Sequence, residues 1–139
     1  MKKLFAALAA AAVLAGCAGG TANQNFIVGD WALNQVIDTA NNAVLDPETN
    51  ASLYSEQNGW YTFAEDGNGT HTIMEAGSPI EQAVTWKKTS GNNYTISDGN
   101  GIDLEVTYES KDDALHRYYK AASEAETYSE LEFVYTRKK

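Results

Sequence analysis

Ile102-Asp103-Leu104-Glu105-Val106-Thr107-Tyr108-Glu109 alternates apolar and polar side chains over its whole length. Successive side chains of a β-strand point to opposite faces, so this segment predicts a strand with one buried face and one face in water. Antiparallel sheets commonly have one solvated face, whereas strands of parallel sheets are usually apolar on both sides. The segment therefore predicts an all-β, antiparallel fold.

The same period of two recurs on both sides of this segment. Within the first expected strand, Trp31, Leu33 and Ile37 are predicted to share the buried face. That first strand covers 28–37. Besides it and 102–109, the expected strands are 60–65, 69–75, 80–88, 93–97, 113–120 and 128–137. Most links between them are short and rich in Gly and Asn, which favour tight turns and antiparallel neighbours. The sequence thus predicts an eight-stranded up-and-down meander that closes into a barrel and so removes its exposed edges.

The connection over 38–59 is longer than the other links. Asp46 and Pro47 are typical of the first positions of a helix, and Gly59 is typical of the residue after its end. We therefore expect one short helix over 47–57, lying across one end of the barrel.

The chain begins with Met1-Lys2-Lys3, followed by an apolar run that ends in Leu14-Ala15-Gly16-Cys17. A basic start, a short apolar run and small residues form the order of an export signal. The run is shorter than the roughly 20 residues that span a bilayer. This start resembles the signal peptide and lipobox of bacterial lipoproteins.

The lipoprotein resemblance implies cleavage before Cys17, the only cysteine, and attachment of acyl chains such as palmitate to it. Ala18, in place of Asp, implies sorting to the outer membrane, on its periplasmic face. The expected organisation is a signal peptide over 1–16, a lipidated flexible tether over 17–26 and one barrel domain over 27–139.

The net charge of the chain is −9, and removal of Lys2 and Lys3 makes it more negative. Such a surface repels nucleic acid and anionic lipid headgroups, so no nucleic-acid partner is expected and the membrane contact falls to the lipid on Cys17. The acidity would suit a basic protein partner or simply favour solubility. We expect a monomer.

Gly29-Asp30-Trp31 opens the first strand, and Arg137 closes the last with the inward parity of Phe133 and Tyr135. These residues resemble the Gly-x-Trp signature of the lipocalin and fatty-acid-binding superfamily. The resemblance implies that Arg137 packs over Trp31 and closes the barrel base, and that the chain is a small bacterial lipocalin-like lipoprotein.

Arg117 shares the parity of Leu115 and Tyr119, which predicts that it points into the barrel. There it could receive a ligand carboxylate, or it could pair with an acidic side chain near a rim. His71 is expected either as a polar contact in a cavity or as a packed or surface residue. His116 has the opposite parity and is expected to face solvent.

Trp86, Tyr108 and Tyr119 belong to a large set of aromatic residues for one small domain. They either line a cavity for an apolar ligand or fill the core, since an eight-stranded barrel can be hollow or solid. The favoured hypothesis is a binding module that holds a small, mainly apolar molecule under the 38–59 connection. The alternative is a filled barrel that serves as a protein-interaction or inhibitor module.

No motif of catalysis or cofactor binding is present in the sequence, so we expect neither an enzyme nor a cofactor. Two histidines without a second cysteine or a His-x-His spacing make a poor zinc site, and no metal is expected. Asp66-x-Asn68 and Asp98-x-Asn100 resemble the start of a calcium loop but lack its closing glutamate, which predicts hairpin turns.

Overall fold

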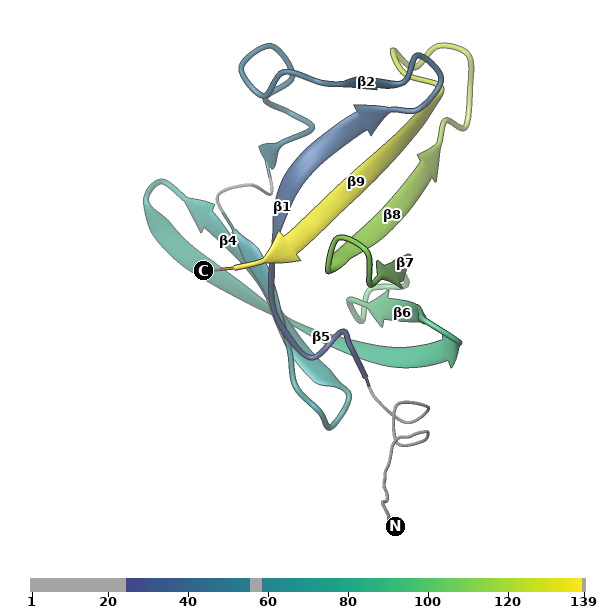
Figure 1. Ribbon diagram of the computed structural model, residues 1–139. Coiled ribbons are helices and arrows are strands. Elements are labelled where there is room, and N and C mark those ends of the chain that lie inside the picture. The colour runs from purple at the N-terminus through teal and green to yellow at the C-terminus, as the bar shows by residue number, and fades with distance from the viewer. Residues whose placement is uncertain (1–24, 56–58, 139) are drawn as a thin grey trace.

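The computed structural model describes residues 25–55 and 59–138 and is all-β. Its strands are β1 (Gly29–Asp38), β2 (Ala43–Val44), β3 (Trp60–Phe63), β4 (Asn68–Glu75), β5 (Ser78–Ser90), β6 (Asn93–Ser97), β7 (Asp103–Glu109), β8 (Ala114–Lys120) and β9 (Glu130–Arg137). Strands β1 and β3 to β9 pair antiparallel in chain order, and β9 pairs back on β1 (Figure 1). The predicted eight-stranded antiparallel barrel is therefore confirmed, with β2 as an additional short strand on β1.

The predicted signal peptide over 1–16, Cys17 and most of the tether lie outside the described residues. No helix long and apolar enough to cross a membrane occurs in the part of the chain that the structure describes.

A β-bulge in β1 changes which residues face the core. Leu33 is opposite Tyr135 and Gln35 is opposite Val134, so Asn34 is an extra residue in the pairing of β1 with β9. An extra residue reverses the alternation beyond it. Val36 is therefore fully buried while Ile37 is only half-buried, and the prediction that Ile37 shares the face of Trp31 was wrong.

The described part of the predicted helix, 47–55, consists of turns. Asp46 does begin a helix-like turn, because its carboxylate accepts the Glu48 N–H at 2.7 Å and its carbonyl accepts the Asn50 N–H at 3.0 Å. The Asn50 side-chain amide also donates to this carbonyl, at 2.9 Å, and such local side-chain bonds favour turns over helices.

The hydrogen bonds of Tyr54 also favour a non-helical conformation of this connection. Its hydroxyl accepts the N–H of Val36 at 2.8 Å and donates to the carbonyl of Leu45 at 2.8 Å. The buried tyrosine thereby ties the 38–55 connection to β1, and this long-range bond is not visible in local sequence.

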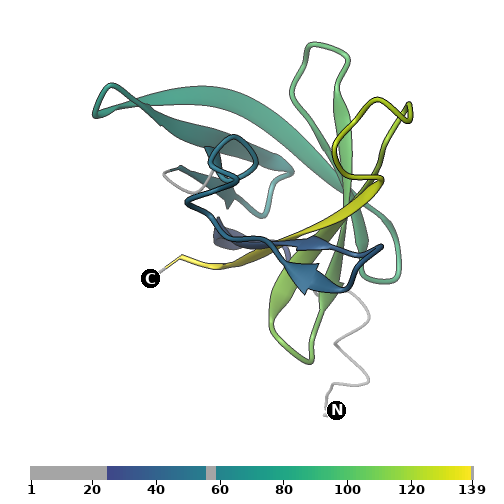
Figure 2. The ribbon, with the colours of Figure 1, turned by 90° about the horizontal axis from the view of Figure 1, so that it is seen from above.

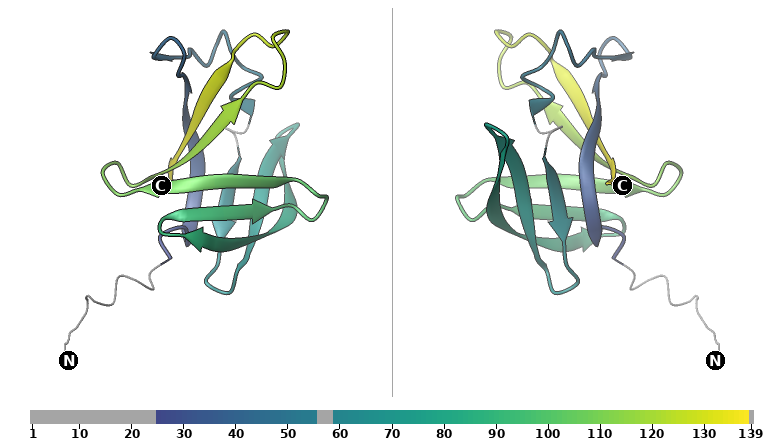
Figure 3. Two further views of the ribbon diagram at one scale, coloured as in Figure 1. Left: turned by 90° about the vertical axis from the view of Figure 1, so that its right-hand side faces the viewer. Right: turned by 90° about the vertical axis from the view of Figure 1, so that its left-hand side faces the viewer.

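The two ends of the barrel differ. The described chain enters at one end, the base, whereas the 38–55 connection and the link between β8 and β9 lie together at the other end, the mouth (Figures 1 and 3). The view from above shows both connections beside the mouth and the β4–β5 hairpin extending away from them (Figure 2). The largest fully buried side chains of the core are Trp31, Tyr94, Phe63, Ile27, Leu115 and Val36.

Candidate functional site

The base of the barrel is closed by Arg137. Its guanidinium carbon lies 4.2 Å from the centre of the Trp31 ring, and its Nη1 and Nη2 donate to the carbonyls of Val28 and Phe26, both at 3.0 Å. Gly29 has a φ of +133°, which other residues rarely adopt, and a Cβ there would lie 2.6 Å from Nη1 of Arg137, so an added side chain would be strained and would displace the guanidinium. This is the arrangement that the Gly-x-Trp resemblance implies.

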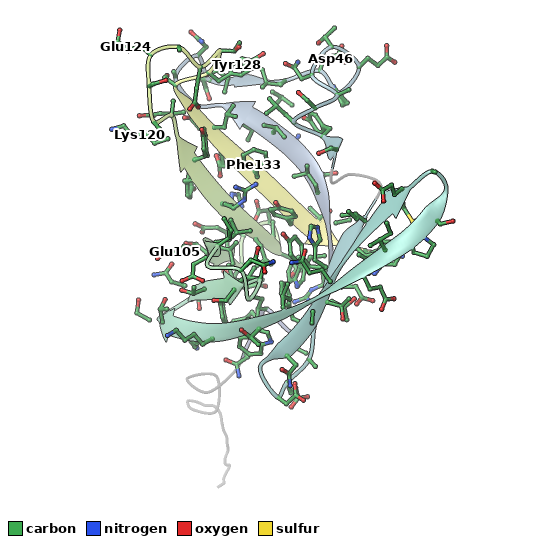
Figure 4. The ribbon with its side chains drawn as sticks, turned by 180° about the vertical axis from the view of Figure 1, so that it is seen from behind. Asp46, Glu105, Lys120, Glu124, Tyr128 and Phe133 are labelled. Atoms are coloured by element: carbon green, nitrogen blue, oxygen red, sulfur yellow. The ribbon has the colours of Figure 1, made fainter. Side chains whose placement is uncertain are left out.

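The mouth holds a cavity of about 710 Å³. The segment around Leu53 forms one wall, the link between β8 and β9 forms another, and the inner faces of β8 and β9 form the rest. Figure 4 shows Phe133 on the inner face of β9 and Tyr128 closer to the mouth. The lining residues are Thr49, Asn50, Ser52, Leu53, Arg117, Tyr119, Ala125, Glu126, Thr127, Tyr128, Leu131 and Phe133. The cavity is therefore mixed, with apolar walls and with one cation, Arg117, and one carboxylate, Glu126, among the described residues that line it.

Arg117 points into the barrel and is half-buried. Its guanidinium carbon lies 4.1 Å from the centre of the Phe133 ring, and Nη2 donates to the Tyr135 hydroxyl at 3.4 Å. The same side chain lines a second cavity of about 260 Å³. The charge thus stands between the two cavities, shielded from bulk water on its aromatic side, where attraction to an anion is stronger than at the surface.

Tyr119 lies in the wall of the mouth cavity, where its hydroxyl donates to Glu126 at 2.5 Å. This hydrogen bond to a carboxylate raises the pKa of Tyr119 above its ordinary value. Across the cavity, the Tyr128 hydroxyl donates to Asn50 at 2.6 Å and joins the two connections that border the mouth. These bonds hold the rim in place above Arg117.

His71 lines the second cavity and stacks on Tyr61, with ring centres 4.1 Å apart and planes 5° apart. Val84, Ile96 and Leu104 make much of this cavity apolar. His71 is therefore both packed and cavity-lining, and it is not the surface residue that the sequence also allowed.

Trp86 and Tyr108 lie away from the mouth. Tyr108 stacks on Phe26 with ring centres 4.6 Å apart, and its hydroxyl donates to Asp113 at 2.8 Å. Trp86 donates from its indole N–H to the carbonyl of Ala64 at 2.9 Å. Both side chains are buried, so the structure does not bring these two predicted ligand contacts together with Arg117 and Tyr119.

Several residues that line the mouth cavity were not predicted as site residues from the sequence. Phe133 and Leu131 have inward parity, which marks them as interior without separating cavity from core. Leu53, Asn50 and Tyr128 come from irregular connections, where no period assigns a direction to a side chain.

His116 corrects a sequence-based expectation. It lies on the outer face of β8 but is only 7% exposed, with Nε2 2.9 Å from Asp112 and Nδ1 in contact with the Glu132 carboxylate. An imidazole that faces two carboxylates can donate to both when it is protonated. The expectation that His116 faces solvent was wrong. Its parity places it correctly on the outer face, but parity does not reveal that neighbouring side chains bury it there.

Within residues 25–55 and 59–138, no group of three or more His, Cys, Asp or Glu side chains could hold a metal ion. The chain was compared with protein-family models, with curated proteins and with solved structures. None of these comparisons finds a match.

Proposed function

We propose that this chain is a lipocalin-like lipoprotein of the bacterial cell envelope that binds a small, mainly apolar molecule with an anionic group. The observation that carries the binding proposal is the mouth cavity of about 710 Å³ with Arg117 in its wall. Pockets for small ligands usually have volumes of about 300–1,000 Å³ and combine apolar walls with few polar groups.

The chemistry of the lining supports an orientation for the ligand. Leu53, Leu131 and Phe133 offer apolar contact, while Arg117 offers a planar, permanently charged partner for a carboxylate or a similar anion. The acidic group would therefore lie deep at Arg117, and the apolar part would extend toward the mouth. Tyr119 and Tyr128 would border the apolar part at the rim.

The proposed anchor rests on the sequence alone. Lys2, Lys3, the apolar run and Cys17 have the order of a lipoprotein signal, and Ala18 favours the outer membrane. Acyl chains on Cys17 would hold the barrel at the periplasmic face, because each buried CH₂ contributes about 0.8 kcal/mol.

Native mass spectrometry of the full chain, extracted gently from its own host in mild detergent, tests both parts. A mass that lacks residues 1–16 and carries acyl chains on Cys17 supports the anchor, and an unmodified full-length mass contradicts it. A stoichiometric adduct of small mass that is lost on activation supports the ligand. A bare protein that also fails to bind anionic apolar probes contradicts the binding proposal.

A further inference from the structure

One side of the barrel wall is incomplete. β5 pairs with β6 only from Thr85 onward, so no described strand pairs with Ser78–Val84 on that side. β8 pairs with β7 only up to His116, which leaves its last part open as well. We call this opening, bordered by Ser78–Val84 of β5 and 117–120 of β8, the notch.

The notch lies where the sheet between β5 and β8 is no longer filled by β6 and β7. β7 crosses below the opening, with β8 and the β4–β5 hairpin diverging above it (Figure 3, left). β6 and β7 occupy the sheet between β5 and β8 lower down, so at ordinary strand spacing the two edges start about 14 Å apart there, and they diverge above. This separation is sufficient for an additional strand between them.

The hairpin turn over 76–77 fixes which backbone groups of β5 face the notch. Glu75 and Ser78 flank a two-residue turn and so form a hydrogen-bonded pair, after which alternate residues of β5 bond to β4. The N–H of Trp86 donates to the carbonyl of Gly67 at 2.8 Å, in keeping with this alternation.

The intervening residues of β5 direct their backbone groups the other way. The N–H and C=O groups of Glu81 and Ala83, and the carbonyl of Pro79, therefore face the notch. Exposed strand edges of this kind can accept an extended peptide through main-chain hydrogen bonds.

The inner side of the notch combines exposed aliphatic side chains with polar ones such as Gln82 and Arg117. Ile80 is 44% exposed and Ile102 is 57% exposed, although both are large aliphatic side chains. Gln82 and Val84 follow Ile80 on the same face of β5 and line the 260 Å³ cavity, as does Ile102. An apolar side chain of an added strand would enter this cavity.

The outer side of the notch is acidic. Glu81 on β5 and Asp103 and Glu105 on β7 are exposed, and they alternate with inward-facing neighbours. Lys87 lies lower on β5, where that strand is paired with β6, and Lys120 lies on the far edge. Basic side chains on the outer face of an added strand would meet Glu81, Asp103 and Glu105.

We propose that the notch binds an extended segment of a partner protein, which pairs with the β5 edge as a strand and alternates apolar with basic side chains. A basic partner segment suits this edge better than a second copy of the chain, because two-fold pairing of the β5 edges about Glu81 would place like charges opposite each other. This inference does not rest on the proposed function of the mouth cavity.

Amide hydrogen exchange of the full chain with the peptide acetyl-KVKVKVKVK-amide tests the pairing. The peptide is expected to slow exchange at Glu81 and Ala83 by at least about tenfold, while Gln82, which bonds to β4, changes little. Unchanged exchange at Glu81 and Ala83 at saturating peptide overturns the proposal. So does equal binding of acetyl-KKKKKVVVV-amide, which has the same composition without the alternation.

Charge variants test the acidic face. Glu81→Lys and Glu105→Lys are expected to weaken binding of the alternating peptide by about fivefold or more each. Glu124→Lys is the matched control, since Glu124 is an exposed acid in the β8–β9 connection, far from Glu105 (Figure 4). An equal effect of the control variant would overturn the assignment to the notch.

Discussion

The guanidinium of Arg137 lies over the indole of Trp31 at 4.2 Å and joins the last strand to the first. The same side chain contacts Asp113 at 3.2 Å, so the turn between β7 and β8 is held at the base as well. One residue thus connects both ends of the described chain to a third element.

Replacing Arg137 with Met is expected to lower the free energy of unfolding by about 2–4 kcal/mol. The change removes a cation–π contact and leaves the carbonyls of Phe26 and Val28 without their donors. Urea unfolding measures the effect. Lys138→Met, which removes a comparable contact with Trp60, is the control and is expected to cost less than about 1 kcal/mol. Equal losses for both variants would contradict a special role of Arg137.

Gly29→Ala tests the close approach at the base separately. Gly29 has a φ of +133°, and the added Cβ would lie 2.6 Å from Nη1 of Arg137, so a loss of about 1–3 kcal/mol is expected in thermal or urea unfolding. Gly99→Ala is the matched control, because Gly99 also has a positive φ, of +84°, but nothing lies within 4 Å of its Cβ. A loss no larger than that of the control would show that backbone strain alone matters.

The period of two was sufficient to predict the barrel, because each strand of the closed sheet has one buried face. It failed where a contact is not local. Beyond the bulge at Asn34, Val36 faces the core in place of Ile37. The hydrogen bond from Tyr54 to β1 competes with the helix that Asp46 and Pro47 favour.

The candidate site was predictable only in part, for the same reason. Parity placed Arg117 on the inner face, yet it could not separate the mouth, where Arg117 and Tyr119 lie, from the base, where Tyr108 lies. Height along the barrel axis depends on register between strands, which a single sequence does not reveal.

Arg117→Met is expected to weaken binding of the anionic dye 8-anilinonaphthalene-1-sulfonate by about tenfold or more, because a hydrogen bond to a charged group contributes about 1.5–3 kcal/mol. A neutral apolar dye is expected to bind with little change, since the Met side chain keeps most of the volume. Lys120→Met removes the same charge from the outer face of β8 and is the control. Loss of binding in the control, or none in Arg117→Met, would contradict the proposed anion contact.

Tyr54→Phe is expected to loosen the 38–55 connection, which the pairing of β2 and the Leu45 N–H bond to the Val36 carbonyl still hold to β1. The variant keeps the buried ring but leaves the N–H of Val36 and the carbonyl of Leu45 unpaired, at a cost of about 1–3 kcal/mol. Amide exchange at Val36 should accelerate, whereas exchange at Leu115, on β8 and separated from β1 by β9, should follow only global unfolding. Unchanged exchange at Val36 would show that the tyrosine hydroxyl does not hold the connection.

Alkaline pH is expected to destabilise the barrel through Tyr108. Burial and the hydrogen bond to Asp113 raise the pKa of Tyr108 in the folded chain above its ordinary value near 10, despite the opposing charge of Arg137. The stability contributed by this raised pKa is fully present below pH about 10 and is lost as the pH rises through the folded-state pKa. Tyr108→Phe keeps the ring that stacks on Phe26 but cannot ionise, so its free energy of unfolding should fall less steeply above pH about 10. Some dependence should persist, because burial also raises the pKa of Tyr94. Urea unfolding of both proteins at neutral and alkaline pH measures the difference, and identical slopes would exclude Tyr108 as a source.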